Sequence, residues 1–224
     1  MKTRIITIDG PAGVGKTTLA RKTAGHLKIA YMDTGAMYRG VAWFAAAVDW
    51  ERRPERLAAI LDKMEFSLCG SGRDTLMLLN GVPLDDRIRT EEIGMRASDM
   101  ARLPVVRDFL KGAQQRLGER ASLVAEGRDM GTVVFPKASA KFFLHASPRV
   151  RAKRRQVQLA EMGRPVDFEG LLESIQKRDE QDRNRKAAPL KPASDAYVID
   201  TGDKDVQEVL ARILTCLEVD PGGG

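Results

Sequence analysis

The chain has 224 residues, 43% of them hydrophobic and 5% aromatic, so it can bury the core of one domain and is not a disordered chain. Its 37 basic residues exceed its 31 acidic residues, and the net charge of +6 indicates an anionic partner: nucleic acid, a membrane surface or phosphorylated small molecules. Two distant cysteines and two histidines exclude a zinc cluster of the usual spacing. With no long apolar run and no signal-peptide pattern, we expect a soluble cytoplasmic protein with no membrane partner.

The most informative stretch follows an alternating apolar run at residues 5–8 and precedes a helical pattern at 19–24. A strand, a Gly-rich GxxxxGK[ST] loop and a helix, in that order, are the context of a phosphate-binding loop rather than of a plain turn. We therefore expect Lys16 to bridge the β- and γ-phosphates of ATP and the Thr17 hydroxyl to bind Mg²⁺. The loop, hereafter the P-loop, consists of Gly10, Pro11, Ala12, Gly13, Val14, Gly15, Lys16, Thr17 and Thr18.

A second short strand is predicted over residues 29–33, and a helix should follow it through residue 46. Asp33 and Thr34 stand where a helix N-cap belongs, and Arg39 falls on the first turns. Taken alone, this stretch is equally typical of an ordinary capped helix with an exposed arginine.

Residues 62–83 change the pattern. Short β-like runs at 64–68 and 75–79 are separated by glycine turns, which predicts a small antiparallel sheet. Residues 88–117 read as helices broken at Pro104, and they carry Ser98 and Arg107. This insert is too short to fold alone, so we expect it to pack as a flap on the main domain.

The next predicted strand, residues 122–125, is followed by Glu126, Arg128 and Asp129. Ligands of open α/β sheets bind beyond the carboxyl ends of the strands, so these three side chains are candidates for the site, although a short charged stretch is often only a solvated loop. Further strands are predicted over residues 141–145 and 196–200, and a last helix over 206–217.

Basic residues concentrate in residues 147–191, where twelve Lys or Arg face seven Asp or Glu. A helix opens at Ser147 and places Arg151 and Arg155 one turn apart, where they repel unless an anion lies between them. A second helix starts at Asp167. Five residues of this helix should share one face, apolar at one end and charged at the other: Leu171, Ile175, Arg178, Asp182 and Arg185. Such a face is typical of a helix that enters an active site, and also of a helix whose end carries solvated ion pairs.

Strands alternate with helices along most of the chain, and we find no internal repeat. This order predicts the α/β class, with a parallel sheet covered by helices on both faces and one β-containing insert.

Four motifs in register resemble the bacterial cytidylate kinases, which are nucleoside monophosphate kinases. They are the P-loop, DTGAMYR at residues 33–39, EGRDMGTVVFP at 126–136 and RDEQDRNR at 178–185. The resemblance covers almost the whole chain, including the insert. It implies a single P-loop kinase domain over residues 1–224, with a monophosphate-binding flap at about 34–117 and a helical lid at about 148–167. It also implies transfer of the γ-phosphoryl group of ATP to CMP or dCMP, with Mg²⁺, by a monomer.

The resemblance also assigns roles to single residues. The acceptor-phosphate contacts fall on Arg39, Arg128 and Arg185, the cytosine contacts on Ser98, Arg107 and Asp129, and the ribose contacts on Arg178 and Asp182. Lid arginines that would close over ATP are Arg151, Arg154 and Arg155, and together with Lys16 these arginines would stabilise charge during transfer. Two positions depart from the commoner pattern: Thr34, in the substrate-binding set, stands where Ser is frequent and keeps the hydroxyl, and Glu126 stands where Asp is frequent.

Other readings remain open. A kinase for AMP or shikimate is disfavoured by the β insert and by the charged face of the second helix. A GTPase would need an Asn-Lys-x-Asp segment, which the chain lacks. A nucleic-acid-dependent ATPase would need aromatic residues among the basic ones, where Phe168 stands alone. We therefore expect no nucleic-acid partner.

Overall fold

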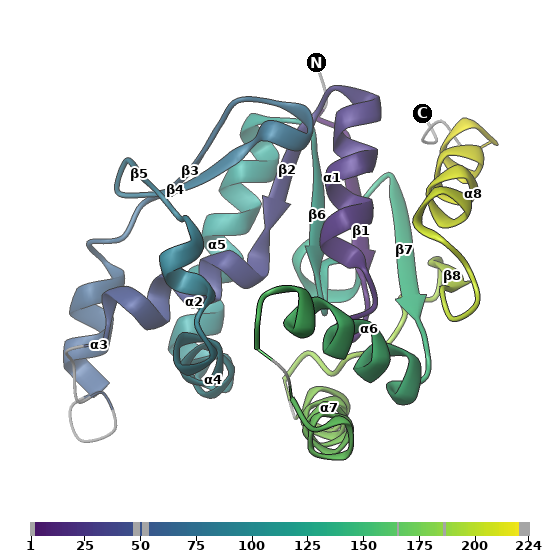
Figure 1. Cartoon of the computed structure of the whole chain (residues 1–224). Coiled ribbons are helices and arrows are strands. Elements are labelled where there is room, and N and C mark those ends of the chain that lie inside the picture. The colour runs from purple at the N-terminus through teal and green to yellow at the C-terminus, as the bar shows by residue number, and fades with distance from the viewer. Residues whose placement is uncertain (1–2, 47–49, 51–53, 165, 186, 220–224) are drawn as a thin grey trace.

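The computed structural model describes residues 3–46, 50, 54–164, 166–185 and 187–219. Its centre is a five-stranded sheet in the order β2-β6-β1-β7-β8, and every neighbouring pair is parallel (Figure 1). The parallel sheet predicted from the sequence is confirmed. The strands are β1 (Ile5–Asp9), β2 (Ala30–Asp33), β6 (Leu123–Gly127), β7 (Ala140–His145) and β8 (Tyr197–Asp200).

Helices cover both faces of this sheet, because successive side chains of a strand point to opposite sides. In β1, Ile6 and Ile8 pack with residues of α1 (Lys16–Leu27) and α8 (Val206–Val219). Ile5 points the other way, into the core that α5 (Pro104–Arg120) shares with the insert. The carboxyl ends of the strands thus lie between two helical layers, which is where a ligand site is expected.

The insert forms its own layer beside the main sheet (Figure 1). The expected small antiparallel sheet is present, in the order β3-β4-β5, and Pro104 begins α5 as expected. The first helix of the insert ends at Phe44, two residues before the predicted end at residue 46. The elements before α5 are α2 (Thr34–Phe44), α3 (Pro54–Leu61), β3 (Phe66–Cys69), β4 (Leu76–Leu79), β5 (Val82–Pro83) and α4 (Glu91–Met100).

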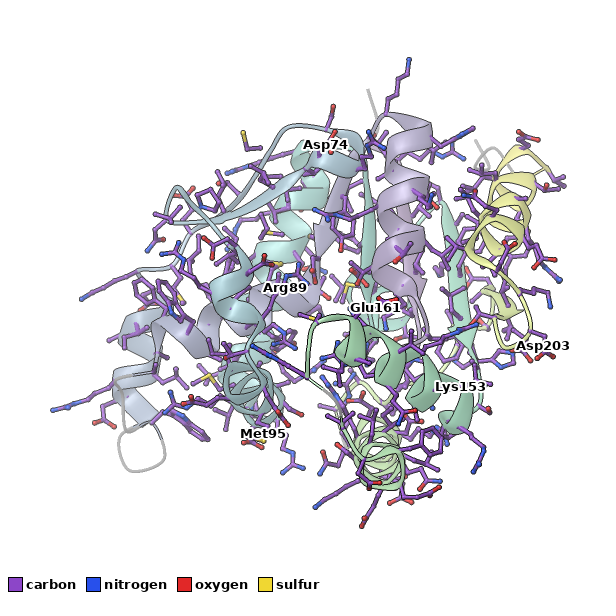
Figure 2. The ribbon with its side chains drawn as sticks, in the orientation of Figure 1. Asp74, Arg89, Met95, Lys153, Glu161 and Asp203 are labelled. Atoms are coloured by element: carbon purple, nitrogen blue, oxygen red, sulfur yellow. The ribbon has the colours of Figure 1, made fainter. Side chains whose placement is uncertain are left out.

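Two helices, α6 (Pro148–Glu161) and α7 (Phe168–Asn184), pack against each other in front of the P-loop. Both begin where predicted, and the side chains of Ser147 and Asp167 cap them. In the view of Figure 2, α6 runs from the β7 side of the molecule towards the insert, with Lys153 on its first half and Glu161 at its end. In the part of the chain that the structure describes, no helix is long and apolar enough to cross a membrane.

One boundary corrects the sequence-based prediction. Strand β6 continues through Glu126 to Gly127, so Glu126 lies inside the strand and not beyond its end. It pairs with Ile8 of β1 on one side and with Asp33 of β2 on the other. A short π-helical turn, Met130–Val134, follows and had not been predicted. A carboxylate in a central strand is tolerated here because its oxygens have hydrogen-bond partners.

Candidate active site

The P-loop leaves β1 in a backbone conformation that requires glycine. A Cβ atom on Gly10 would lie 2.3 Å from the carbonyl oxygen of Leu144, and both Gly13 and Gly15 have positive φ, at 75° and 94°. Gly15 is also the N-cap of α1 and has no side chain with which to cap it. The N–H groups of the first turn of α1 therefore remain available to an anion, and the helix dipole favours one.

Lys16 is buried at the start of α1, and its Nζ donates to the carbonyl oxygen of Pro11 at 2.8 Å. Burial lowers the pKa of Lys16, and the nearby Arg128 guanidinium lowers it further, whereas Glu126 acts in the opposite direction. A phosphate bound in the loop would restore the preference for the charged amine. The position and the environment of Lys16 thus both favour the binding of an anion in the loop.

A hydroxyl and a carboxylate meet at the carboxyl end of β6. Thr17 Oγ1 donates to Glu126 Oε2 at 3.0 Å, and Thr34 Oγ1 donates to the backbone oxygen of Glu126 at 2.6 Å. Burial raises the pKa of Glu126, and the nearby Asp33 carboxylate raises it further. Asp33 caps α2 as predicted, accepting from the N–H of Ala36 at 2.8 Å. The hydroxyl oxygen of Thr17 and the carboxylate oxygens of Glu126 are ligands of the kind that Mg²⁺ prefers.

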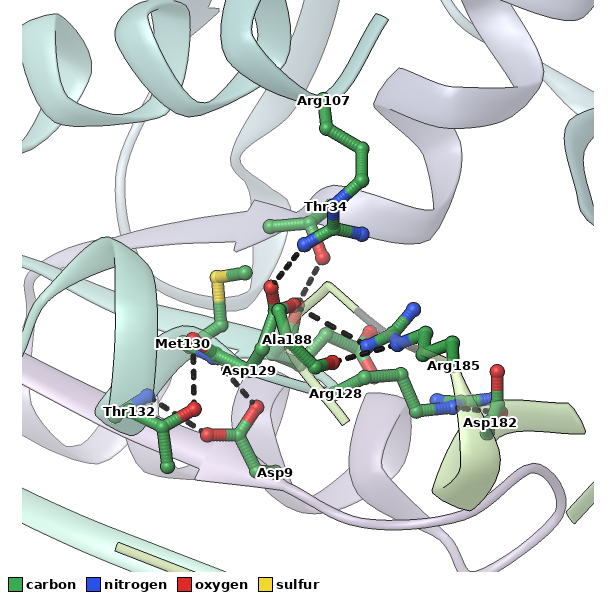
Figure 3. A network of polar contacts seen from close by, with 12 residues as sticks. Asp9, Thr34, Arg107, Arg128, Asp129, Met130, Thr132, Asp182, Arg185 and Ala188 are labelled. Carbon is green, nitrogen blue, oxygen red and sulfur yellow. Dashed lines mark hydrogen bonds and ion pairs between the residues drawn. The ribbon is translucent and has the colours of Figure 1, made fainter. Parts of the chain in front are cut away.

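Asp129, two residues after the end of β6, is held by two arginines from different elements (Figure 3). Arg107 Nη2 of α5 lies 2.5 Å from Asp129 Oδ2, and Arg185 Nη2, just past the end of α7, lies 3.8 Å from Oδ1. Arg128 Nε donates to Asp182 Oδ2 of α7 at 2.9 Å. Burial alone would raise the pKa of Asp182, but Arg128, together with Arg185 and Arg178, outweighs that effect and the pKa is lowered. Residues separated widely in sequence thus converge here.

Of the other predicted acceptor-site residues, Arg39 and Arg178 lie within electrostatic reach of this network or of each other. Arg39 Nη1 donates to the carbonyl oxygens of Ile88 and Thr90, both at 3.2 Å. Arg178 is exposed on α7 within electrostatic reach of Arg128, Asp182 and Arg39. Ser98 is partly buried on α4.

The three predicted lid arginines behave differently from one another. The prediction that Arg151 faces an incoming anion is not supported, because its side chain is fully buried: it pairs with Asp179 and donates to Ala12 O at 3.0 Å. Arg154 donates to the backbone oxygens of Thr201 and Gly202 after β8. Arg155 is exposed and donates to Gln158 at 2.7 Å. Of the three, Arg151 is buried, Arg154 is half-buried and only Arg155 is exposed.

Three buried residues of the site region escaped the sequence analysis. Asp9 accepts from the N–H groups of Met130 and Gly131, at 3.0 and 2.8 Å, and so fixes the turn after Asp129. Asp9 stands at the end of β1, directly before the P-loop, and this position could have indicated that it belongs to the site. The pairings of Tyr31 and of Asp179, which stands in the motif at 178–185, gave no such signal, since their partners are distant in sequence.

Comparison with known proteins agrees with this arrangement. The family model described as "Cytidylate kinase" matches residues 6–219. The cytidylate kinase of Oleidesulfovibrio alaskensis is 55% identical over 96% of this chain and 98% of its own length, and that of Maridesulfovibrio salexigens is 52% identical over 94% of each. A solved structure of an uncharacterized protein from Eubacterium ventriosum superposes with a TM-score of 0.50 at 18% identity, covering 97% of this chain and 99% of that one, and it supports the fold alone. The chain therefore belongs to the cytidylate kinase family.

Proposed function

We propose that the protein transfers the γ-phosphoryl group of ATP to CMP or dCMP, giving ADP and CDP or dCDP. The observation that carries this proposal is that Lys16 of the P-loop lies near Arg128, at the carboxyl ends of β1 and β6. The next residue, Asp129, is held by Arg107 of α5 and by Arg185, just past α7. The P-loop end of this site suits the phosphates of a nucleoside triphosphate. The end around Asp129 suits a nucleoside monophosphate whose base offers hydrogen-bond donors and acceptors.

The acceptor phosphate would be bound by Arg39, Arg128 and Arg185. Arg185 Nη2 is buried, and among the described residues it has no hydrogen-bond partner, although its Nε donates to Ala188 O at 2.5 Å. The Asp129 carboxylate, 3.8 Å away, is too far to accept from it, and a buried donor without a hydrogen bond costs free energy, so it favours a ligand that accepts from it. Arginine suits a phosphate because its planar fork can donate two parallel hydrogen bonds.

The cytosine base would be bound by Asp129, Arg107 and Ser98. Cytosine presents an amine donor at N4 beside acceptors at N3 and O2, so a carboxylate can accept from N4 while an arginine and a serine donate to the acceptors. Uracil reverses two of these groups and would leave buried polar atoms unpaired. Arg178 and Asp182 would contact the ribose, and Thr34 completes the set at the start of α2.

The P-loop, with Lys16 at its end, would bind the phosphates of ATP, and Arg154 and Arg155 would close on it. Thr17 and Glu126 fit a magnesium site. Mg²⁺ in sites of this kind is commonly bound by one or two protein oxygens together with phosphate oxygens of the substrate. When bound, Mg²⁺ neutralises developing phosphate charge.

The chemistry needs no general base, because an ionised phosphate oxygen of the acceptor is the nucleophile. The main cost is electrostatic, since two polyanions must approach end to end, and Lys16 with the arginines offsets it. Closing the site also excludes water, which would otherwise compete with CMP and hydrolyse ATP.

We further propose that residues 34–117 act as the monophosphate-binding flap and residues 148–167 as the lid of one kinase domain, and that the protein works as a cytoplasmic monomer. The packing of α4 against α2 and of α6 against α7 supports these two units.

The test is ADP production from MgATP with CMP, dCMP, UMP, AMP and GMP, each against a control without acceptor. We expect a rate largely confined to CMP and dCMP, and no stimulation of the control by single-stranded DNA. Equal rates with all acceptors, or activity in the control alone, would overturn the proposal.

A further inference from the structure

The Glu126 carboxylate is held from both sides by hydroxyl groups. Tyr31 of β2 donates its phenolic O–H to Oε1, while Thr17 of the P-loop donates to Oε2 at 3.0 Å. Tyr31 is 4% exposed and Glu126 5%, so the hydrogen bond between them is shielded from bulk water, whereas Thr17 lies at the surface. One oxygen of the carboxylate is thereby occupied by Tyr31, and the other is directed towards the residue that would bind Mg²⁺.

Tyr31 is itself held by contacts within the protein that involve neither Thr17 nor Glu126. Its backbone N–H donates to Thr75 Oγ1 at 3.1 Å, and that hydroxyl in turn donates to the carbonyl oxygen of Gly72 at 2.7 Å. The Arg21 guanidinium of α1 lies 5.4 Å from the centre of its ring. The phenol is therefore a rigid support with a defined direction.

The need for such a support follows from the length of the glutamate. A glutamate has one more rotatable bond than an aspartate, so its side chain has more rotamers and loses more conformational entropy when its carboxylate is fixed in one position. Because Glu126 Oε2 must stay beside the Thr17 hydroxyl, this long side chain is held better by a second anchor on Oε1. Tyr31 provides that anchor.

We propose that Tyr31 is a positioning residue for the magnesium site, which acts by holding Glu126 Oε1 so that Oε2 stays beside the Thr17 hydroxyl. This inference rests on the proposed function, since it takes Thr17 and Glu126 to be the magnesium-binding residues. A purely structural role, in which Tyr31 only satisfies a buried carboxylate, would affect folding but not metal affinity.

The experiment compares Tyr31→Phe with the unchanged protein. Mn²⁺ is titrated in the presence of the nonhydrolysable ATP analogue adenylyl imidodiphosphate and followed by electron paramagnetic resonance. Residues behind metal ligands typically change metal affinity 10- to 100-fold, so we expect roughly 10-fold weaker Mn²⁺ binding. Binding of the analogue without metal should be unchanged. The matched control is Tyr197→Phe, because Tyr197 is a strand tyrosine that stacks on Phe142 in another part of the sheet.

Steady-state kinetics give a second readout. The Mg²⁺ concentration for half-maximal activity should rise in Tyr31→Phe while the KM for CMP stays the same, and excess Mg²⁺ should restore the rate. In a double-mutant cycle, Tyr31→Phe should have little further effect on Mn²⁺ affinity in a Glu126→Asp background, because the shorter side chain no longer reaches Tyr31.

Unchanged Mn²⁺ affinity in a folded Tyr31→Phe protein would overturn the inference. If that variant fails to fold, Tyr31→His, which keeps a hydrogen-bond donor on a shorter side chain, tests the same contact: weaker Mn²⁺ binding supports the inference, and equal binding refutes it. The titration contains no CMP, so its outcome is independent of whether CMP is the acceptor, and a failure of the proposed function would be recognised separately.

Discussion

Arg151 and Asp179 form a two-pronged ion pair inside the protein, with Nη1 3.0 Å from Oδ1 and Nη2 2.5 Å from Oδ2. The same guanidinium donates to Ala146 O and to Ala12 O, so one side chain joins α6, α7 and the P-loop. Since α7 also carries Asp182, which pairs with Arg128, this ion pair connects the loop for ATP with the acceptor side.

Asp179→Ala should destabilise the protein strongly, because it leaves the fully buried Arg151 charge without its partner. Removing one member of a buried pair typically costs about 3–5 kcal/mol, and urea unfolding measures it. Replacing both residues by apolar ones, as in Arg151→Met with Asp179→Leu, should recover much of that loss. The control Asp74→Ala removes a surface partner of Arg73 and should leave the unfolding midpoint unchanged.

Asp9 gives a prediction about pH. Burial raises its pKa from 3.8 to about 6, against the lowering effect of the N–H groups of Gly131 and Met130. The folded protein therefore holds this proton more tightly than the unfolded chain, and the contribution of Asp9 to stability falls as pH rises from about 4 to about 6. By linkage the fall is about 3 kcal/mol. Urea unfolding of the unchanged protein and of Asp9→Asn across this range measures it; a difference between the two that does not vary with pH would contradict the prediction.

Asp129→Ala tests the choice of base. The substitution removes the acceptor for the cytosine amine and leaves Arg107 without the carboxylate that lies 2.5 Å away. We expect kcat/KM for CMP to fall roughly 100-fold or more, while the rate with UMP changes much less, so that the preference for CMP is lost. Rates with CMP and UMP from the same preparation provide the internal comparison. A variant that kept its full preference would show that other residues read the base.

The local patterns of the sequence predicted the fold well. The P-loop, the caps at Asp33, Ser147 and Asp167, and the break at Pro104 are all determined by neighbours a few residues away, and the structure confirms them. In each case the backbone requirement and the residue that meets it lie within one turn, so periodicity and capping preferences suffice.

Long-range polar contacts could not be predicted in the same way. Arg151 lies 28 positions from Asp179, and charge spacing along its own helix suggested a bound anion in place of a buried carboxylate. Glu126 was placed beyond the strand because the apolar run ends at Ala125, and the partners that satisfy its carboxylate, Tyr31 and Thr17, are 95 and 109 positions away. Only the assembled sheet brings these groups together.

Arg155 offers the sharpest test of the lid. It is exposed on α6, and it is close enough to Arg39 for its charge to contribute to lowering the pKa of that guanidinium, after burial and Arg89. If Arg155 closes on the transferring phosphate, Arg155→Ala should lower kcat with CMP by roughly 100-fold with little change in thermal stability. Lys153→Ala is the matched control, because Lys153 is an exposed cation on the same helix (Figure 2). Equal effects of the two substitutions would mean that the general positive charge of α6 matters and that the position of Arg155 does not. A loss confined to Arg155→Ala would identify the one exposed arginine of the proposed lid set as the group that meets the phosphates.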